Sequence, residues 1–468
     1  MSSTTTTTPP SIADAGNRIQ PPQKRAALTV AMLGFAVVAL DAQITNVALP
    51  AIRQHLGGGL SGLQWVVTGY TMMFSALLLF GGSVADRIGS KNAYRYGMAL
   101  FVLASLLCGL APSLPVLIAA RLVQGVGAAL VTPTSLSLVR EAFEDARERA
   151  RAIALWAVGG SVAAAAGPLL GGILVQADWR LIFFINVPVG AVALGVLTRA
   201  AESPRRPARF DVPGQVSAVL AFGGLTYGCI EGGSRGFGAA PVIAAFAVAV
   251  VAFGTFLAVQ ARSSCPMVPL ALFRSRPVAV TLAVPFITMA GFYGMVFLQS
   301  LYFQQQRGHS ALATGLLFLP MTALVAVLSY LAPRIAGRFG RLVPIVAGQL
   351  SMAGGLLTLA VLPANAPVLL VALVMIFVGG GGGLTVPPIA ALIFDTAPAR
   401  LAGTASGVLN TFRQMGGSLG VAVFGAVVDA SAHFTSGLRA DFAATAVLIG
   451  LAALLSLTLR GAQGTQNL

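Results

Sequence analysis

The sequence predicts an all-α polytopic membrane protein with fourteen transmembrane helices, arranged as two six-helix bundles plus two extra central helices. Of the 468 residues, 56% are hydrophobic and only 9% are charged. A soluble globular protein carries about 25% charged residues. The mean hydropathy is +0.85, and the apolar residues gather into runs long enough to cross a bilayer as helices. A loop motif also recurs at matching positions among the first six and the last six runs.

Each apolar run is close to the length of about 20 residues that a membrane-spanning helix needs. The third and fourth runs are separated only by the tight turn "APSLP", and the seventh run is rich in glycine. In chain order, the predicted spans are 27–49, 63–83, 96–113, 114–139, 152–175, 181–198, 212–231, 239–261, 278–302, 313–333, 342–362, 366–391, 403–428 and 440–459.

The basic residues predict the side of the membrane on which each loop lies. An even number of spans places both termini on the same side. Of the 29 lysines and arginines, two lie within spans, and the loops on one side hold Arg53, Arg180, Arg235, Arg307 and Arg439. All others lie at the opposite side, and because cytoplasmic loops carry the excess of Lys and Arg, both termini are predicted to be cytoplasmic. This topology accounts for the net charge of +15, so no nucleic-acid partner is expected.

The polar segments divide the chain into five parts. The first 25 residues are rich in threonine and proline, a composition typical of disorder. The segment "ESPRRPARFDVPG" leads into the two extra helices. The predicted parts are a disordered cytoplasmic tail (1–25), a six-helix bundle (26–201), a connector with two extra transmembrane helices (202–275), a second six-helix bundle (276–460) and a cytoplasmic tail (461–468).

The recurring motif points to an internal duplication. The loop after the second span reads "GGSVADRIGSKN", and the loop after the tenth reads "APRIAGRFGRLV". Aligning Arg87-Ile88-Gly89 with Arg338-Phe339-Gly340 places these turns at the same point of two six-span sets. Duplicated bundles related by an axis along the membrane normal are a transporter architecture, with the substrate bound between the halves.

Composition and spacing argue against other classes of function. The three cysteines and three histidines have no metal-ligand spacing, so no metal site is expected. The glycine run 379–383 lies within a span and lacks the Gly-Lys-Ser/Thr ending of a phosphate-binding loop. No set of nucleophile and base stands out. We therefore expect neither an enzyme nor a cofactor.

Several motifs together resemble one family. The loop after the second span contains Gly82-x-x-x-Asp86-Arg87-x-Gly89-x-Lys91, the fourth span contains "LIAARLVQGVGAA", and the fifth contains "AAAAGPLLGG". With "QWVVTGY", "WRLIFFINVPVG" and "SGVLNTFRQMGG", they make the chain similar to the fourteen-span drug:proton antiporters of the major facilitator superfamily. The stretches "LIAARLVQG" and "LYFQQQRG" resemble methylenomycin-type exporters in particular.

The resemblance implies the major facilitator fold and a conformational switch in the loop after the second span. In such a switch, charged helix ends latch the two halves together and separate during transport. Ser90 stands where the family usually has a basic residue. A loop that serves only to set the topology is the alternative. The switch residues would be Gly82, Asp86, Arg87, Gly89 and Lys91.

The fifth span resembles the antiporter signature, which goes with export rather than uptake. The signature residues are Gly167, Pro168, Gly171 and Gly172, whereas alanine replaces earlier glycines of the family pattern. The proline is expected to kink the span, and the glycines allow another helix to approach closely. Ordinary packing of small residues is the alternative interpretation.

Two ionisable residues within spans are candidates for proton coupling. Asp41 lies about 12 Å from the outer end of the first span, and Arg121 about 10 Å from the outer end of the fourth, at 1.5 Å per residue. Ionisable residues inside a membrane are functional candidates by default. Since the resemblance places both spans beside the central cavity, we expect the two side chains to interact, directly or through water. A static polar network around Asp41 is the alternative.

Further polar and aromatic residues are candidates for the substrate cavity. Arg413 lies near the middle of the thirteenth span, with Asn410 three residues before it, and a role in coupling or in packing is open. Glu231 ends the seventh span, where an interfacial role is favoured over a second proton site. The complete set of candidates is Gln124, Tyr70, Phe74, Phe292, Phe297, Asn410, Arg413 and Glu231.

The resemblance therefore implies a proton-coupled secondary exporter of small amphipathic toxic compounds or antibiotics, working by alternating access. A proton-linked exporter of one endogenous metabolite or siderophore is the alternative. The implied partners are a drug-like small molecule and the lipid bilayer, with the proton as the coupling ion and a single chain as the working unit. The implied location is the bacterial cytoplasmic membrane.

Overall fold

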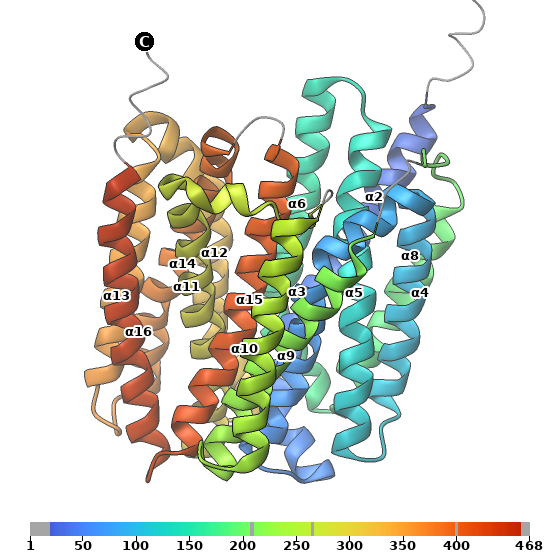
Figure 1. Cartoon of the computed structure of the whole chain (residues 1–468). Coiled ribbons are helices and arrows are strands. Elements are labelled where there is room, and N and C mark those ends of the chain that lie inside the picture. The colour runs from blue at the N-terminus through green and yellow to red at the C-terminus, as the bar shows by residue number, and fades with distance from the viewer. Residues whose placement is uncertain (1–18, 206–209, 264–265, 398–400, 460–468) are drawn as a thin grey trace, which may run out of the picture.

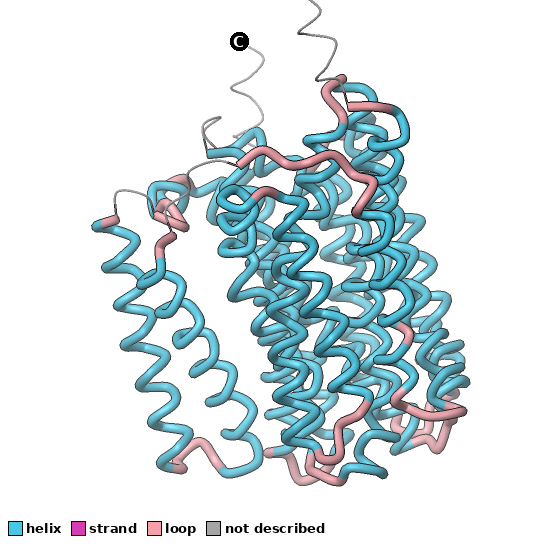
Figure 2. The backbone as a smooth tube through the Cα atoms, turned by 90° about the vertical axis from the view of Figure 1, so that its right-hand side faces the viewer, coloured by secondary structure: helices cyan, strands magenta, loops and turns pink. Residues whose placement is uncertain are grey.

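The computed structural model describes residues 19–205, 210–263, 266–397 and 401–459. These residues are almost entirely helical, and none of them forms a strand (Figures 1 and 2). Most of the two expected tails, at 1–18 and 461–468, lies outside the described residues. The first helix begins at Pro21, so the last five residues of the expected N-terminal tail are helical instead.

Two sets of helices and a pair between them make up the molecule (Figure 1). The N-terminal set contains α2 (Pro21–Leu56), α3 (Leu60–Ile88), α4 (Ser90–Gly109), α5 (Leu114–Ala142), α6 (Ala146–Val175), α7 (Leu181–Phe184) and α8 (Asn186–Leu197). The central pair is α9 (Val212–Arg235) and α10 (Ala240–Arg262). After the short η1 (Leu270–Arg274), the C-terminal set contains α11 (Arg276–Leu301), its extension η2 (Tyr302–Gln306), α12 (Ala311–Phe339), α13 (Leu342–Val361), α14 (Val368–Thr396), α15 (Ala402–Asp429) and α16 (Phe434–Leu457).

Fourteen helical segments thus cover the fourteen predicted spans, with α7 and α8 together forming the sixth. By length and composition alone, ten of the described helices are apolar enough to cross a membrane. The other segments are α4, α7 with α8, α9 and α15. The hydropathy of α4 is lowered by polar residues such as Lys91 and Arg95, and that of α15 by Asn410 and Arg413. The α7–α8 segment is short.

The break between α7 and α8 has a local cause. A single span was predicted at 181–198, but the helix is interrupted at Ile185. Pro188 has no N–H, so the carbonyl of Phe184, one turn earlier, lacks its helical donor. The break places Asn186 at the first position of α8, where its side chain turns into the interior of the N-terminal set.

The two aligned turns adopt the same conformation. Gly89, between α3 and α4, has φ and ψ of 88° and 142°, and Gly340, between α12 and α13, has 82° and 154°. A residue with a side chain rarely adopts this positive φ, so glycine is required at both positions. The similar backbone angles of these two glycines support the duplication inferred from the sequence.

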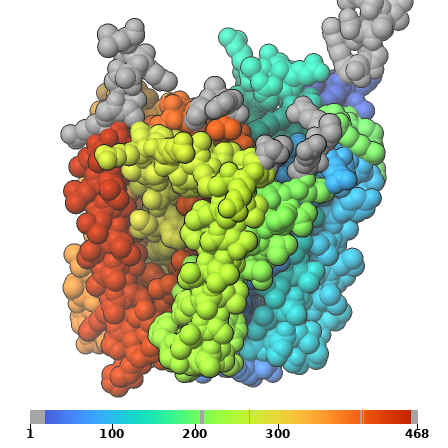
Figure 3. Space-filling view, viewed as in Figure 1, coloured from blue at the N-terminus to red at the C-terminus, as the bar shows by residue number. Residues whose placement is uncertain are grey.

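The central pair stands at the side of the molecule. In Figure 2, α9 and α10 are the two helices at the left, and Figure 3 shows α10 in yellow-green on the front surface. The helix α9 packs against α3 and α15, whereas α10 packs chiefly against α9. The side chains of Val250 and Val251 on α10 are 71% and 69% exposed, as expected for a helix that faces lipid.

Helix ends define two faces of the molecule. The termini face is the end at which α2 begins and α16 ends, and the far face is the opposite end (Figure 1). Four side-chain hydrogen bonds join the two sets among the described residues, and all lie toward the far face. Gln64 of α3 donates to the carbonyls of Val421 and Ala422 in α15, at 3.1 and 2.7 Å. Ser300 and Gln304 donate to backbone carbonyls of α2 at 2.7 and 3.0 Å. The two sets are therefore closed against each other at the far face.

Candidate functional site

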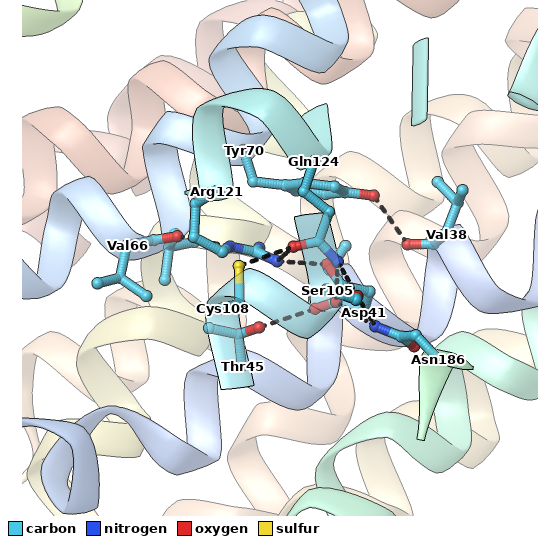
Figure 4. Close-up of polar contacts among 12 residues, drawn as sticks. Val38, Asp41, Thr45, Val66, Tyr70, Ser105, Cys108, Arg121, Gln124 and Asn186 are labelled. Carbon is cyan, nitrogen blue, oxygen red and sulfur yellow. Dashed lines mark hydrogen bonds and ion pairs between the residues drawn. The ribbon is translucent and has the colours of Figure 1, made fainter. Parts of the chain in front are cut away.

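Asp41 of α2 and Arg121 of α5 form a buried ion pair (Figure 4). Arg121 Nη1 lies 2.5 Å from Asp41 Oδ2, and both side chains are at most 1% exposed. The similar depth estimated from the sequence therefore corresponds to direct contact between the two side chains. No water is needed to connect them.

Three neutral side chains complete the site around the carboxylate. Gln124 and Asn186 donate to Asp41 Oδ1 at 2.9 and 2.8 Å. The same two amides donate to the hydroxyl of Ser105 on α4, at 2.7 and 2.9 Å. Gln124 also accepts a hydrogen bond from Arg121 Nη1 at 2.7 Å. Asp41 Oδ2 thus faces the cation and Oδ1 faces two amide donors, and hydrogen bonds of this kind to an ionised group are strong.

The guanidinium of Arg121 is held on its other sides as well. Its Nε donates to the carbonyl of Val66 in α3 at 3.0 Å. The centroid of the Tyr70 ring lies 4.3 Å from the guanidinium carbon, and that of Phe183 lies 5.7 Å away. Cations are attracted to the faces of aromatic rings at such distances. Helices α2, α3, α4, α5, α7 and α8 all contribute to this site, which we call the charge cluster.

The charge cluster lies inside the N-terminal set and not at the surface between the sets. Asp41, Arg121, Gln124, Asn186 and Ser105 are all 0% exposed. Gln124 was expected to line the substrate cavity, and the structure places it among the ligands of the carboxylate instead. A compound between the two sets would reach the charge cluster only through a rearrangement of the N-terminal set.

The loop between α3 and α4 was expected to latch the two halves together, but its polar contacts among the described residues are with α5 and the connector and not with the C-terminal set. Lys91 Nζ donates to Glu202 Oε1 and to the carbonyl of Ala200, both at 2.7 Å, just after α8. This bond from Lys91 lowers the pKa of Glu202. Asp86 is exposed and has no partner among the described residues.

Two hydroxyls extend these contacts to α5. Ser90 and Ser203 donate to the two carboxylate oxygens of Glu141, each at 2.6 Å. The guanidinium of Arg87 lies 4.8 Å from the ring centroid of Phe210, further along the same connector. Gly82 has open space around its Cα. Ser90, the departure from the family pattern, thus takes part in anchoring the start of the connector.

The glycines of the antiporter signature mark close contacts of α6. A Cβ atom on Gly167 would lie 2.7 Å from Gln43 of α2, and one on Gly171 would lie 2.9 Å from the carbonyl of Ile44. Gly172 faces the C-terminal set instead, because a Cβ there would lie 2.7 Å from the carbonyl of Ala311 in α12. Pro168 is buried, and its carbonyl lies against Gly315 of α12. The signature therefore packs α6 against both sets near the far face.

Replacement of Gly172 by valine should separate the far ends of α6 and α12. The contacting atoms on α12 belong to its backbone, so the helices must move apart, and overpacking of this kind costs about 1–3 kcal/mol. Distances between spin labels on these far ends should increase, and transport should fall. The matched control is Gly450→Val on α16, where a Cβ meets nothing within 4 Å. Unchanged label distances in Gly172→Val would contradict the role assigned to this contact.

The aromatic candidates for the substrate cavity are buried in the cores of the two sets. Tyr70 and Phe74 are 0% and 3% exposed, and the Tyr70 hydroxyl donates to the carbonyl of Val38 at 3.2 Å. Phe292 and Phe297 are 7% and 0% exposed in α11. These rings act in packing in this conformation, and Tyr70 also contacts the charge cluster.

The remaining polar candidates occupy different positions. Glu231 accepts hydrogen bonds from Trp65 Nε1 at 3.1 Å and from Arg235 Nε at 2.7 Å, and so ties α9 to α3 near the far face. These two hydrogen bonds satisfy the carboxylate of Glu231, as expected for a residue at the membrane interface. Arg413 is partly exposed, with an Nε that has no hydrogen-bond partner among the described residues, and Asn410 lies one turn before it.

Sequence reasoning missed Ser105 and Asn186 as members of the charge cluster. Both are short polar residues inside predicted spans, which is the signal that could have singled them out. A third missed residue is Asp441, a carboxyl buried in α16. The predicted span begins at 440, which places this carboxyl at the very end of a span rather than within it.

Two matching sets of membrane helices, closed at one face, with a buried charge pair in one of them, define a polytopic α-helical membrane transporter. Residues 31–421 match the family model described as the Major Facilitator Superfamily. The chain belongs to this superfamily, and the all-helical fold agrees with it.

Individual proteins support the same assignment. The chain is 38% identical over 435 residues to the Methylenomycin A resistance protein of Bacillus subtilis, covering 92% of each chain. It is 39% identical over 401 residues to the Multidrug resistance protein Stp of Mycobacterium tuberculosis, covering 85% of this chain and 74% of that protein. The crystal structure of a D-xylose-proton symporter has the same fold, with a TM-score of 0.67, 16% sequence identity, and coverage of 93% of this chain and 97% of that one.

Proposed function

We propose that this protein exports small amphipathic toxic compounds or antibiotics and that proton entry drives the export. The buried pair of Asp41 and Arg121 carries the proposal, because a carboxyl inside a membrane protein can bind and release a proton during transport. The drug-resistance names of the two relatives support the class of compound. The antiporter signature at Gly167, Pro168, Gly171 and Gly172 supports the direction of transport.

The proposed mechanism links the proton to the packing of the N-terminal set. A proton on Asp41 removes the negative charge that holds Arg121, Gln124 and Asn186 in their present positions. These residues lie on α5 and α8, so loss of the charge loosens the contacts of those helices with α2. A looser N-terminal set changes its fit against the C-terminal set at the far face. Proton binding and alternating access are coupled in this way.

The location and the working unit are part of the proposal. The excess of basic residues in the loops at the termini face supports a cytoplasmic position for both termini. The membrane is the bacterial cytoplasmic membrane, and the far face then lies outside. A single chain is sufficient, because each half of the transport path comes from one of the two sets.

Expression in a bacterial host that lacks its own efflux pumps tests the proposal. We expect protection against some members of a panel of antibiotics and dyes, with lower accumulation of those compounds in the cells. An ionophore that collapses the proton gradient should abolish the difference in accumulation, because no other energy source is proposed. Cells with an empty vector serve as the control.

Three outcomes are informative. Lower accumulation that persists without a proton gradient would contradict proton coupling. Protection against one compound alone would favour the exporter of a single metabolite. No protection and no difference in accumulation across the panel would contradict drug export.

A further inference from the structure

A second carboxyl is buried in the C-terminal set. Asp441 lies in α16, seven residues after its first residue, or about 10 Å from the far end of the helix at 1.5 Å per residue. It is 4% exposed. Its Oδ2 is buried without a hydrogen-bond partner, and the side chain forms no hydrogen bond or ion pair among the described residues. The charge cluster of the N-terminal set has no equivalent here.

The turns of α16 on either side of Asp441 pack against two other helices. Residues at positions 437, 441 and 445 share one face of α16. Gly437 packs against Val428 of α15, and Thr445 packs against Gly291 of α11. Asp441 therefore lies between these two helices. The rings of Phe424 and Phe442 on α15 and α16 are also in contact, with centroids 6.3 Å apart.

The charged and titratable groups on the helices that pack against α16 lie elsewhere on them. No residue of α13 is charged. The groups on α11, α15 and α16 themselves are Arg276, Tyr293, Arg413, Asp429, His433 and Arg439. None of them forms a hydrogen bond or an ion pair with Asp441. Burying a charged carboxylate without a partner is costly, so a carboxyl in this position is suited to binding a proton.

A small cavity lies on the far-face side of Asp441. Its volume is about 30 Å³, and its lining includes Gln299, Tyr302, Thr435 and Leu438. Leu438 is three residues before Asp441 and therefore about one turn closer to the far face. The Oε1 atom of Gln299 is buried without a donor. A cavity of this size with an unsatisfied acceptor can hold water.

Two arginines bind the turn between α13 and α14 beside the cavity, and Arg439 is one of the residues that line it. Arg439 donates to the carbonyl of Leu362 at 2.8 Å, and Arg307 donates to the carbonyl of Ala364 at 2.9 Å. Arg307 also donates to the Tyr302 hydroxyl at 3.0 Å. These bonds fix the turn between α13 and α14, whose Leu362, Pro363 and Ala364 line the cavity, and the cavity is partly open at this end of the molecule.

We propose that Asp441 is a second proton-binding site, filled and emptied through this cavity from the far face. The step is a proton transfer alone, in which a solvent water accepts the proton from the carboxyl and leaves a carboxylate. The reverse transfer restores the neutral acid. The contribution of this proton to transport rests on the proposed proton-driven export, whereas the existence of the site does not.

Infrared difference spectra of the purified full-length protein, recorded between acid and alkaline buffers, test the site without any substrate. A protonated carboxyl has a carbonyl band that an ionised carboxylate and an asparagine lack. We expect Asp441→Asn to remove one titrating carboxyl from the wild-type spectrum and Asp441→Glu to shift it. The matched control is Asp429→Asn, which removes a partly exposed carboxyl at the far end of α15 and should leave that band in place.

The possible results test proton binding at Asp441 separately from the contribution of this proton to transport. A band that is the same in the wild type and in both Asp441 variants would overturn the site. In vesicles that export a compound, Asp441→Asn should lower the number of protons exchanged per compound by one. An unchanged number would overturn its role in coupling. A wild type that moves no protons with any compound would refute the proposed function, while the spectra would still decide whether Asp441 binds a proton.

Discussion

Asparagine in place of Asp41 is expected to reduce proton-driven export to the background of vesicles without the protein. Asparagine cannot exchange a proton, and it cannot satisfy the partners of the carboxylate. Oδ1 accepts from Gln124 and Asn186, whereas Oδ2 accepts from Arg121. The amide nitrogen of asparagine would therefore face donors on whichever side it takes. The repulsion disturbs the charge cluster but keeps its size, so the protein should still fold.

Two assays on the same vesicles separate coupling from binding. Net export driven by a pH gradient should be lost in Asp41→Asn, while exchange of labelled for unlabelled compound, which requires no net proton movement, should remain. The control is Asp178→Asn, which removes a surface carboxylate whose partner is Arg180. Full net export by Asp41→Asn would show that the driving proton binds elsewhere.

Methionine in place of Arg121 should destabilise the protein more than any other single change described above. The substitution leaves Asp41 buried without its cation, and breaking a buried pair by removing one partner costs about 3–5 kcal/mol. The carbonyl of Val66 would lose its donor as well. We expect a clear fall in the midpoint of thermal unfolding of the purified protein.

The double variant Asp41→Leu with Arg121→Met provides the control for this effect. Replacing both members of a buried pair by apolar residues is often neutral or stabilising. The double variant should therefore recover much of the lost stability, although it should not export. A double variant as unstable as Arg121→Met would mean that packing and the amide contacts, and not the unpaired charge, determine the loss.

The sequence was sufficient for the number of spans and for the pairing of Asp41 with Arg121. The similar depth of the two side chains follows from the constant rise of a helix, whereas the resemblance to the family placed their spans near each other. The turns at Gly89 and Gly340 were also predictable, because their glycines meet a backbone requirement that the sequence displays directly.

Other parts of the site depend on contacts that no local pattern encodes. Ser105 and Asn186 join the charge cluster because α4 and α8 pack beside α2 and α5. The break before α8 directs the Asn186 side chain toward Ser105 and Asp41. Lys91 was predicted to act across the two halves, but its carboxylate partner follows α8 in the connector. Such pairings are decided by the direction in which each loop leaves its helix.

Enclosure of the ion pair within one set has an electrical consequence. With Asp41 ionised, the positive charge of Arg121 is balanced, and the buried pair carries no net charge. A proton on Asp41 leaves one positive charge there. The membrane voltage contributes about 2.3 kcal/mol per elementary charge per 100 mV, and it acts on conformational steps in which that charge moves. In the proposed mechanism, voltage therefore acts on the form with a proton on Asp41 and has little effect on the form from which that proton has left.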